Sequence, residues 1–82
     1  MNNIDATITN IRAQITARGW TITESLDGES KDTQGNINDC HLELIHTDGT
    51  RKAWGYFGRV YCWTEAYESI TGNSWIDAVV RK

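Results

Sequence analysis

The stretch that decides the fold is Cys40-His-Leu-Glu-Leu-Ile-His-Thr-Asp-Gly-Thr-Arg-Lys-Ala-Trp-Gly-Tyr-Phe57. Two runs of alternating side chains, residues 40–46 and 52–57, flank a short polar connection, residues 47–50. An Asp-Gly pair between two such runs is a strong signal for a β-hairpin, because type I′ turns need residues that tolerate positive φ. The sequence therefore predicts two antiparallel strands closed by a two-residue type I′ turn at Asp48-Gly49.

A two-residue turn fixes which residues lie opposite each other, and so which side chains share a face. One predicted face is apolar or small and is assigned to the core: Cys40, Leu42, Leu44, Ala53, Gly55 and Phe57. The opposite face mixes polar and aromatic side chains: His41, Glu43, Trp54 and Tyr56. We expect this second face to meet solvent or a partner, because Trp and Tyr are enriched at the centres of binding interfaces.

The segments before the hairpin supply one helix and one strand. Four isoleucines recur at spacings that form one stripe of a helix: Ile4, Ile8, Ile11 and Ile15. With Asn3 as the N-cap and Gly19 just past the end, a helix is predicted over 4–18. Residues 20–26 alternate with period two and predict a strand, whereas the polar residues 27–38 predict a long loop or an extended hairpin tip.

The segments after the hairpin predict the end of the sheet and a broken helix. The third strand is expected to continue through residues 59–63, past a bulge at Gly58. Thr64 then serves as the N-cap of a helix that Gly72 interrupts, and Ser74 begins a last helical turn. The predicted order of elements is therefore α-β-β-β-α.

The whole chain, 1–82, is predicted to be a single α+β domain, in which a three-stranded antiparallel sheet carries the N-terminal helix and the broken C-terminal helix on one face. With 82 residues there is no room for a second core. No apolar run approaches the roughly 18–20 residues that span a bilayer, and no secretory signal is recognisable. Two cysteines make no disulfide framework, so we expect a cytoplasmic protein with reduced thiols.

Neither a metal site nor a catalytic site is predicted, and no cofactor is expected. The cysteines and histidines lack the closely spaced ligand pairs of structural zinc sites. Cys40 and His41 point to opposite sides of a strand and cannot form a nucleophile–base pair, although His46 with Cys40 or Cys62 stays open. Neighbouring carboxylates lie in a polar loop or at a helix start, where solvation or the helix dipole explains them. A non-enzymatic role is therefore expected.

Acidic residues are concentrated between residues 24 and 39. Five acids stand there against one lysine, a local net charge of −4: Glu24, Asp27, Glu29, Asp32 and Asp39. The formal charge of the whole chain is −3, which argues against a general nucleic-acid binder. The segment is interpreted either as a solvated loop or as an element that steers a basic protein partner towards the chain.

The aromatic residues between 54 and 63 have two interpretations. In so short a chain most of them are expected in the core, because each buries a large apolar area. Alternatively, Trp54 and Tyr56, rimmed by His41 and Glu43, form the centre of a protein interface. A platform for stacking nucleic-acid bases would look similar, but it would need more basic surroundings than this sequence offers.

The α-β-β-β-α order resembles the double-stranded-RNA-binding domain. That family has a lysine-rich start to its last helix, whereas residues 64–68 read Thr-Glu-Ala-Tyr-Glu here, so RNA binding in that mode is not expected. In size, acidity and element order, the chain also resembles the small inhibitors that phages and other mobile elements direct against host defence, anti-CRISPR proteins among them. This second resemblance implies a non-enzymatic inhibitor that occupies the basic surface of a host nuclease or nucleoprotein complex.

We therefore expect a protein-binding inhibitor that acts in the host cytoplasm. Its contact surface is predicted to combine the acidic segment with the polar and aromatic sheet face: Glu24, Asp27, Glu29, Asp32, Asp39, His41, Glu43, Trp54 and Tyr56. The alternative is a small regulatory or structural domain that forms a homodimer through a strand edge or through the same face. In neither case is direct contact with nucleic acid or with a membrane expected.

Overall fold

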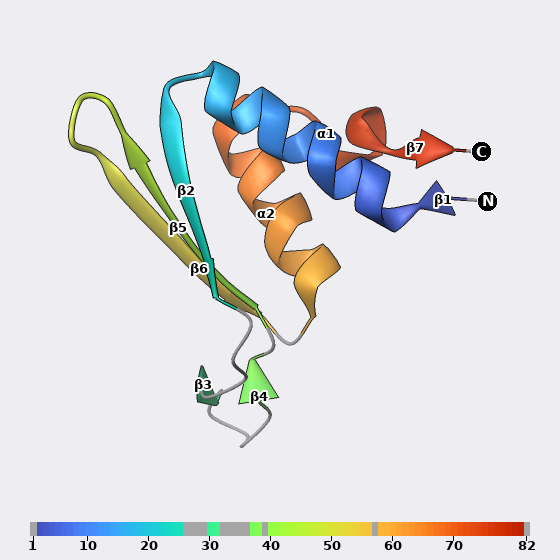
Figure 1. Cartoon of the computed structure of the whole chain (residues 1–82), viewed down its shortest axis with the longest axis horizontal. Helices are drawn as coiled ribbons and strands as arrows, with labels where there is room; N and C mark the ends of the chain where they lie inside the picture. The colour runs from blue at the N-terminus through green and yellow to red at the C-terminus, as the bar shows by residue number, and fades with distance from the viewer. Residues whose placement is uncertain (1, 26–29, 32–36, 39, 57, 82) are drawn as a thin grey trace.

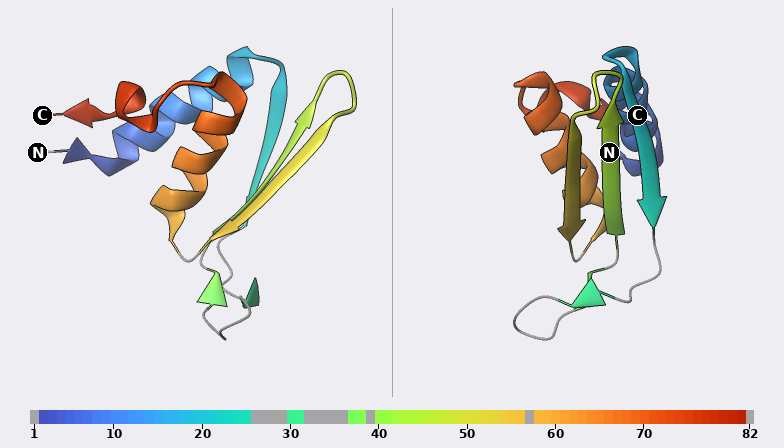
Figure 2. Two further views of the ribbon diagram at one scale, coloured as in Figure 1. Left: turned by 180° about the vertical axis from the view of Figure 1, so that it is seen from behind. Right: turned by 90° about the vertical axis from the view of Figure 1, so that its left-hand side faces the viewer.

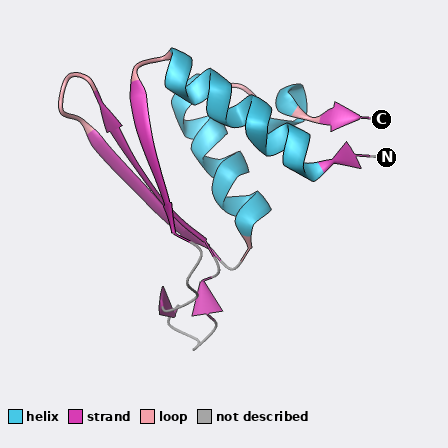
Figure 3. Ribbon diagram, in the orientation of Figure 1, coloured by secondary structure: helices cyan, strands magenta, loops and turns pink. Residues whose placement is uncertain are grey.

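Helices α1 (Ile4–Ala17) and α2 (Arg59–Thr71) lie on one face of an antiparallel sheet whose strand order is β2 (Trp20–Ser25), β5 (Cys40–His46) and β6 (Arg51–Tyr56) (Figure 1). A computed structural model of the chain describes residues 2–25, 30–31, 37–38, 40–56 and 58–81. The predicted α+β class and α-β-β-β-α order are confirmed (Figure 3). In the view turned by 90° from Figure 1, the three strands lie in front of both helices, so no described helix covers the outer face of the sheet (Figure 2, right).

Short elements complete the fold. Strand β1 (Asn2–Asn3) pairs with β7 (Val80–Arg81), which brings the two ends of the described chain side by side. Strands β3 (Ser30–Lys31) and β4 (Ile37–Asn38) form a small antiparallel pair beyond one end of the sheet. A 3-10 helix, η1 (Trp75–Ala78), precedes β7. No helix in the described part of the chain is long and apolar enough to cross a membrane.

The first helix is the one that the isoleucine stripe predicts. The side chain of Asn3 accepts a hydrogen bond from the backbone N–H of Ala6 at 2.9 Å, which satisfies one of the free donors of the first turn. At the other end, Arg18 is the C-cap and Gly19 has a φ of 91°, a conformation that glycine adopts without steric cost. The helix therefore begins and ends where capping chemistry predicts.

The hairpin between β5 and β6 has a longer loop than predicted. The N–H of His46 donates to the carbonyl of Thr50 at 2.8 Å, so the loop has three residues, Thr47, Asp48 and Gly49, instead of two. Three-residue hairpin loops commonly end on a residue with positive φ, and Gly49 has a φ of 94°. The predicted type I′ turn and its register are therefore wrong by one residue.

A shift of one residue turns every side chain of one strand to the opposite face. In the structure Leu42 lies opposite Trp54, and Glu43 lies opposite Ala53. Trp54 is partly buried and packs against the core, so its predicted place on the outer face is corrected. Ala53 and Gly55, predicted for the core face, accordingly belong to the outer face.

The segment after the hairpin is helical rather than extended. Helix α2 begins at Arg59, directly after its N-cap Gly58, so the predicted strand over 59–63 and the predicted cap at Thr64 are both wrong. Gly58 has a φ of 148° and lies between the end of β6 and the start of α2, so it is not a bulge within a strand. The predicted break at Gly72 is confirmed, because Gly72 is the left-handed C-cap of α2. Ser74 likewise caps η1 as predicted.

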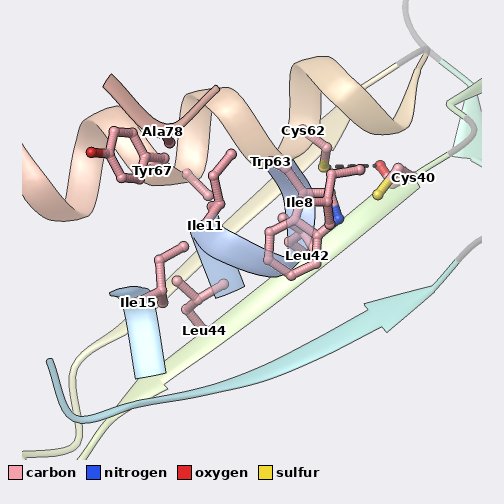
Figure 4. Close-up of a cluster of buried hydrophobic side chains, with 11 residues drawn as sticks. Ile8, Ile11, Ile15, Cys40, Leu42, Leu44, Cys62, Trp63, Tyr67 and Ala78 are labelled. Atoms are coloured by element: carbon pink, nitrogen blue, oxygen red, sulfur yellow. Dashed lines mark hydrogen bonds between the residues drawn. The ribbon is translucent and has the colours of Figure 1, made fainter. Parts of the chain in front are cut away.

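The core lies between the sheet and the two helices (Figure 4). Its buried members come from α1, β5, α2 and η1: Ile8, Ile11, Ile15, Cys40, Leu42, Leu44, Cys62, Trp63, Ala66, Tyr67 and Ala78. Trp20 and Ile22 of β2 pack against this cluster, as the alternation of that strand predicts. Ile4, by contrast, is 55% exposed although it belongs to the same isoleucine stripe as Ile8 and Ile11.

Replacing Gly49 by alanine is expected to lower the free energy of unfolding by about 1 kcal/mol, measured by urea denaturation. A Cβ atom at this position would meet nothing within 4 Å, so the cost is conformational and not steric. Gly49→Asn, a residue that tolerates positive φ better, is the matched control and should cost less than Gly49→Ala. Equal stability of the wild type and Gly49→Ala would contradict the positive φ of Gly49.

Candidate functional site

Much of the predicted contact surface lies outside the described residues. This holds for four of the five acids of the acidic segment: Asp27, Glu29, Asp32 and Asp39. It also holds for the side chain of Tyr56. Their predicted contact with a partner stays a prediction. The remaining predicted residues, Glu24, His41, Glu43 and Trp54, are separated by the structure onto two sides of the sheet.

His41 and Glu43 do lie on the outer face of the sheet. Around them is a shallow hollow of about 440 Å³, and its floor contains the small residues Ala53 and Gly55. Within the described part of the chain, the buried Nε2 atom of His41 has no hydrogen-bond partner. Thr23 and Ser25 of β2 complete the polar lining. The hollow is open and shallow, unlike the enclosing concave sites that usually bind ligands.

Glu24 lies on the helix side of the sheet, where its carboxylate is bound from several directions. Arg59 donates two hydrogen bonds to it, from Nε to Oε2 at 2.8 Å and from Nη2 to Oε1 at 3.1 Å. The indole N–H of Trp63 donates to Oε2 at 2.7 Å. Arg12 approaches Oε1 at 3.5 Å, and its guanidinium lies 4.7 Å from the centre of the Trp63 ring. The Glu24 side chain is only 11% exposed.

These contacts give Glu24 a structural role. The hydrogen bonds from Arg59 hold the pKa of the carboxyl below its ordinary value of 4.5, although burial acts in the opposite direction. The two hydrogen bonds from Arg59 form a bidentate pair, which is stronger and geometrically more specific than a single hydrogen bond between neutral groups. Because Glu24 is in β2, Arg12 in α1 and Arg59 in α2, the cluster joins both helices to the sheet. Its carboxylate is therefore not available to a partner.

The two cysteines lie together in the core, and neither is placed for catalysis. Cys40 and Cys62 are both fully buried, and the thiol of Cys62 donates to the carbonyl of Cys40 at 3.4 Å (Figure 4). Burial raises the pKa of Cys40 far above its ordinary value of 9.0, which disfavours the reactive thiolate. His46 is at the other end of β5, about 20 Å from Cys40 along the strand. The pairing of His46 with a cysteine, left open by the sequence, is therefore excluded by distance for Cys40 and for its neighbour Cys62.

A concave apolar surface, the α1/α2 groove, lies between the first turns of the two helices and the segment after α2. It encloses about 230 Å³. Its lining comes from α1, from α2 and from residues 75–79: Ile4, Thr7, Ile8, Ile11, Val60, Trp63, Thr64, Trp75 and Val79. In Figure 1 the beginning of α1 is at its right-hand end and the beginning of α2 is at its lower end.

The groove combines exposed apolar side chains with polar groups that are already bonded. Ile4, Val60 and Trp75 are 55%, 40% and 37% exposed. Of the two hydroxyls, Thr7 accepts a bond from the N–H of Val80 at 2.8 Å, and Thr64 donates to a carbonyl one turn earlier. The groove is therefore shaped to bury apolar groups and is poor in groups that could carry out chemistry.

The 75–79 wall of the groove is fixed by polar contacts to the helices. The side chain of Asn10 donates to the carbonyl of Ala78 at 3.0 Å, and Glu68 accepts from the N–H of Trp75 at 3.0 Å. The backbone of Trp75 is thus held at the rim. An aromatic side chain beside an apolar hollow is typical of an interface centre.

Sequence reasoning missed this groove because it read residues 59–63 as a strand. The signal was present: Trp63, Ala66, Tyr67 and Ile70 recur at helical spacing, and all four are buried or pack against the core. Read as a helix from residue 59, the same segment places Val60 one turn before Trp63 and Thr64, on the groove side. The β-branched and aromatic composition of residues 59–63 favoured a strand, but packing overrode that propensity.

Metal binding has no support in the described part of the chain, where no three His, Cys, Asp or Glu side chains gather around a common point. Comparison of the chain with family models, with curated proteins and with solved structures finds no match.

Proposed function

We propose that the protein is a non-enzymatic binding module that inhibits a host nucleic-acid-handling complex by docking the α1/α2 groove on one of its protein surfaces. The observation that carries the proposal is the groove, in which Ile4, Val60 and Trp75 are exposed around an apolar hollow. In folded proteins, an exposed apolar surface that is concave and rimmed by polar residues marks an interaction site. The class of target comes from the resemblance of the sequence to small anti-defence inhibitors.

The size of the groove favours protein side chains over a small-molecule ligand. Pockets that enclose drug-sized ligands measure roughly 300–1,000 Å³. The groove, at about 230 Å³, is smaller, and it offers few hydrogen-bonding groups to fix the orientation of a ligand. Apolar side chains projecting from a partner need neither the larger volume nor those groups. Such anchors in well-packed pockets supply most of the affinity of protein interfaces.

The test is the relief of defence in living cells. Bacterial strains that each carry one CRISPR or restriction system are challenged with a phage that the system targets, with and without the protein. We expect the protein to restore plaques in at least one strain, and Val60→Glu to abolish this. A buried, unpaired carboxylate at a hot spot should weaken binding about thirtyfold or more. Thr21→Glu, on the outer face of the sheet, is the matched control and should act like the wild type.

Two outcomes overturn the proposal. One is that no strain of the panel loses its defence, and the other is that Val60→Glu relieves defence as well as the wild type. Loss of the fold is not expected to interfere, because Val60 is 40% exposed and glutamate is at least as good a helix former as valine. Circular dichroism of the purified variant checks this point.

A second copy of the chain is the competing occupant of the groove. Sedimentation velocity at micromolar concentration separates the two cases. The proposal expects a monomer. A dimer that Val60→Glu dissociates would assign the groove to self-association and overturn the proposal.

A further inference from the structure

The walls of the α1/α2 groove limit the conformation of whatever binds there. The wall positions Thr7, Ile8 and Ile11 are in α1, and Trp63 and Thr64 are in α2. Backbone groups inside a helix are already hydrogen-bonded along that helix. An extended peptide in the groove would therefore find few backbone partners, unlike one that adds to a sheet edge. A segment that binds in the groove therefore has to form its backbone hydrogen bonds within itself, as a helix does.

The length of the groove also fits a helix. Along α1 the lining runs from the exposed Ile4 to Ile8 and Ile11, which are buried at the base of the groove, a rise of about 10 Å or two helical turns. A partner helix that lies along this wall presents apolar side chains over the same length when they are spaced i, i+3 or i+4, and i+7. Two to three such anchors match the concave surface between α1, α2 and Trp75.

The charges beside the groove indicate the polar face of that helix. Acidic residues follow directly on lining residues in two places, Asp5 after Ile4 and Glu65 after Thr64. Glu68 is hydrogen-bonded to the backbone of Trp75 at the rim. Two basic residues are also next to lining residues, Arg12 after Ile11 and Arg59 before Val60, and the guanidinium groups of both are bound to Glu24. The surroundings therefore favour a basic partner.

We propose that the α1/α2 groove binds an amphipathic helix of the partner protein, with apolar anchors at helical spacing and lysine or arginine on its flanks. This inference rests on the proposed function, because it assumes that the groove is the binding surface. It adds the conformation and the charge of the segment that is recognised.

A selection from random peptides tests it without knowledge of the target. A display library of random sixteen-residue peptides is selected on the full chain, with counter-selection on Val60→Glu. We expect groove-dependent peptides with apolar residues at helical spacing, a positive net charge, and helical circular dichroism on binding. A proline placed in the middle of a selected peptide should weaken binding about thirtyfold or more, because it breaks the helix at a cost of about 3 kcal/mol.

The charge contribution has its own matched pair of variants. Glu65→Lys beside the groove should weaken a selected peptide about fivefold at low salt, with a smaller effect at high salt. Glu43→Lys, the same change on the outer face of the sheet, should leave the affinity unchanged. Equal effects of the two variants would show that the charge beside the groove is not recognised, and would overturn that part of the inference.

The failure of this inference is distinguishable from the failure of the proposed function. Selected peptides that depend on the groove but are extended, rich in proline or acidic would overturn the inference that the bound segment is a basic helix. They would leave the groove as the binding surface. Recovery of no groove-dependent peptide would overturn the inference as well. The proposed function is tested separately, by the relief of phage defence in the presence of the wild type and its loss in Val60→Glu.

Discussion

Replacing Glu24 by alanine is expected to lower the free energy of unfolding by about 3 kcal/mol. The substitution leaves the guanidinium of Arg59 and the buried indole N–H of Trp63 without the acceptor that they share. Hydrogen bonds to charged groups contribute more than neutral ones, and stranding a buried donor costs its desolvation as well. Because a chain of this size has a stability of roughly 4–12 kcal/mol, the loss is a large part of the total.

Urea denaturation at pH 7 measures the change, and Glu43→Ala is the matched control. Glu43 lies in the neighbouring strand β5 but is exposed on the outer face, so its removal should change the stability by less than about 0.5 kcal/mol. Similar losses for the two variants would mean that the contacts of Glu24 contribute no more than a surface carboxylate does.

The same carboxylate gives a pH dependence with a definite sign. The pKa of Glu24 is lowered in the folded protein, so its contribution is fully present above the ordinary pKa of 4.5. As the pH falls, the unfolded chain takes up the proton first, and the contribution is lost until the folded carboxylate is protonated too. The stability difference between the wild type and Glu24→Gln should therefore shrink as the pH falls through and below the ordinary pKa of 4.5. A difference that stays constant over this range would contradict the lowered pKa.

The alternation of β2 already predicts that the Glu24 side chain points inward, but its charge favoured an interpretation as part of the acidic segment. Along β2 it has the same parity as Trp20 and Ile22, both of which pack against the core. Period two therefore predicts an inward side chain, whereas the acids that follow it in the sequence favour a solvated segment. The sequence does not show which side chains neutralise the buried carboxylate, because Arg12 and Arg59 lie far from Glu24 along the chain and contact it only after folding.

The helices and strands were more predictable than the faces that they present. Capping residues and the isoleucine stripe define α1 within one residue, because those signals are local. The faces of β6 depend on the number of residues in the hairpin loop. The segment Thr47-Asp-Gly-Thr50 is compatible with a loop of two or of three residues, and the choice reverses the direction of Trp54. Packing of Trp54 on the core decides between them.

The candidate site depends most on contacts between distant segments, so it was the least predictable feature. Ile4 and Trp75 are separated by most of the chain and meet because β1 pairs with β7 and Asn10 binds the carbonyl of Ala78. A local sequence pattern cannot predict such a contact between distant segments. The sequence does provide the exposed apolar residues themselves, but it cannot say which members of a helical stripe the sheet will cover.

Ile11→Ala and Ile4→Ala are expected to differ by about 3 kcal/mol in their effect on the free energy of unfolding, although both remove the same atoms from the same stripe of α1. Ile11 is fully buried between the helices and the sheet, so its truncation leaves a cavity and should cost about 3–4 kcal/mol (Figure 4). Ile4 is 55% exposed at the rim of the groove, and its truncation should cost less than about 1 kcal/mol.

Urea denaturation of the two variants measures the difference, and binding gives the complementary result. Ile4→Ala removes an apolar wall of the groove while leaving the protein folded, so it should weaken a groove-bound peptide about tenfold, within the range of hot-spot truncations. Stability and binding are thus separated within one stripe: Ile11 supports the fold and Ile4 supports recognition. If Ile4→Ala destabilises as strongly as Ile11→Ala, the first turn of α1 is part of the core and the groove is not an open surface.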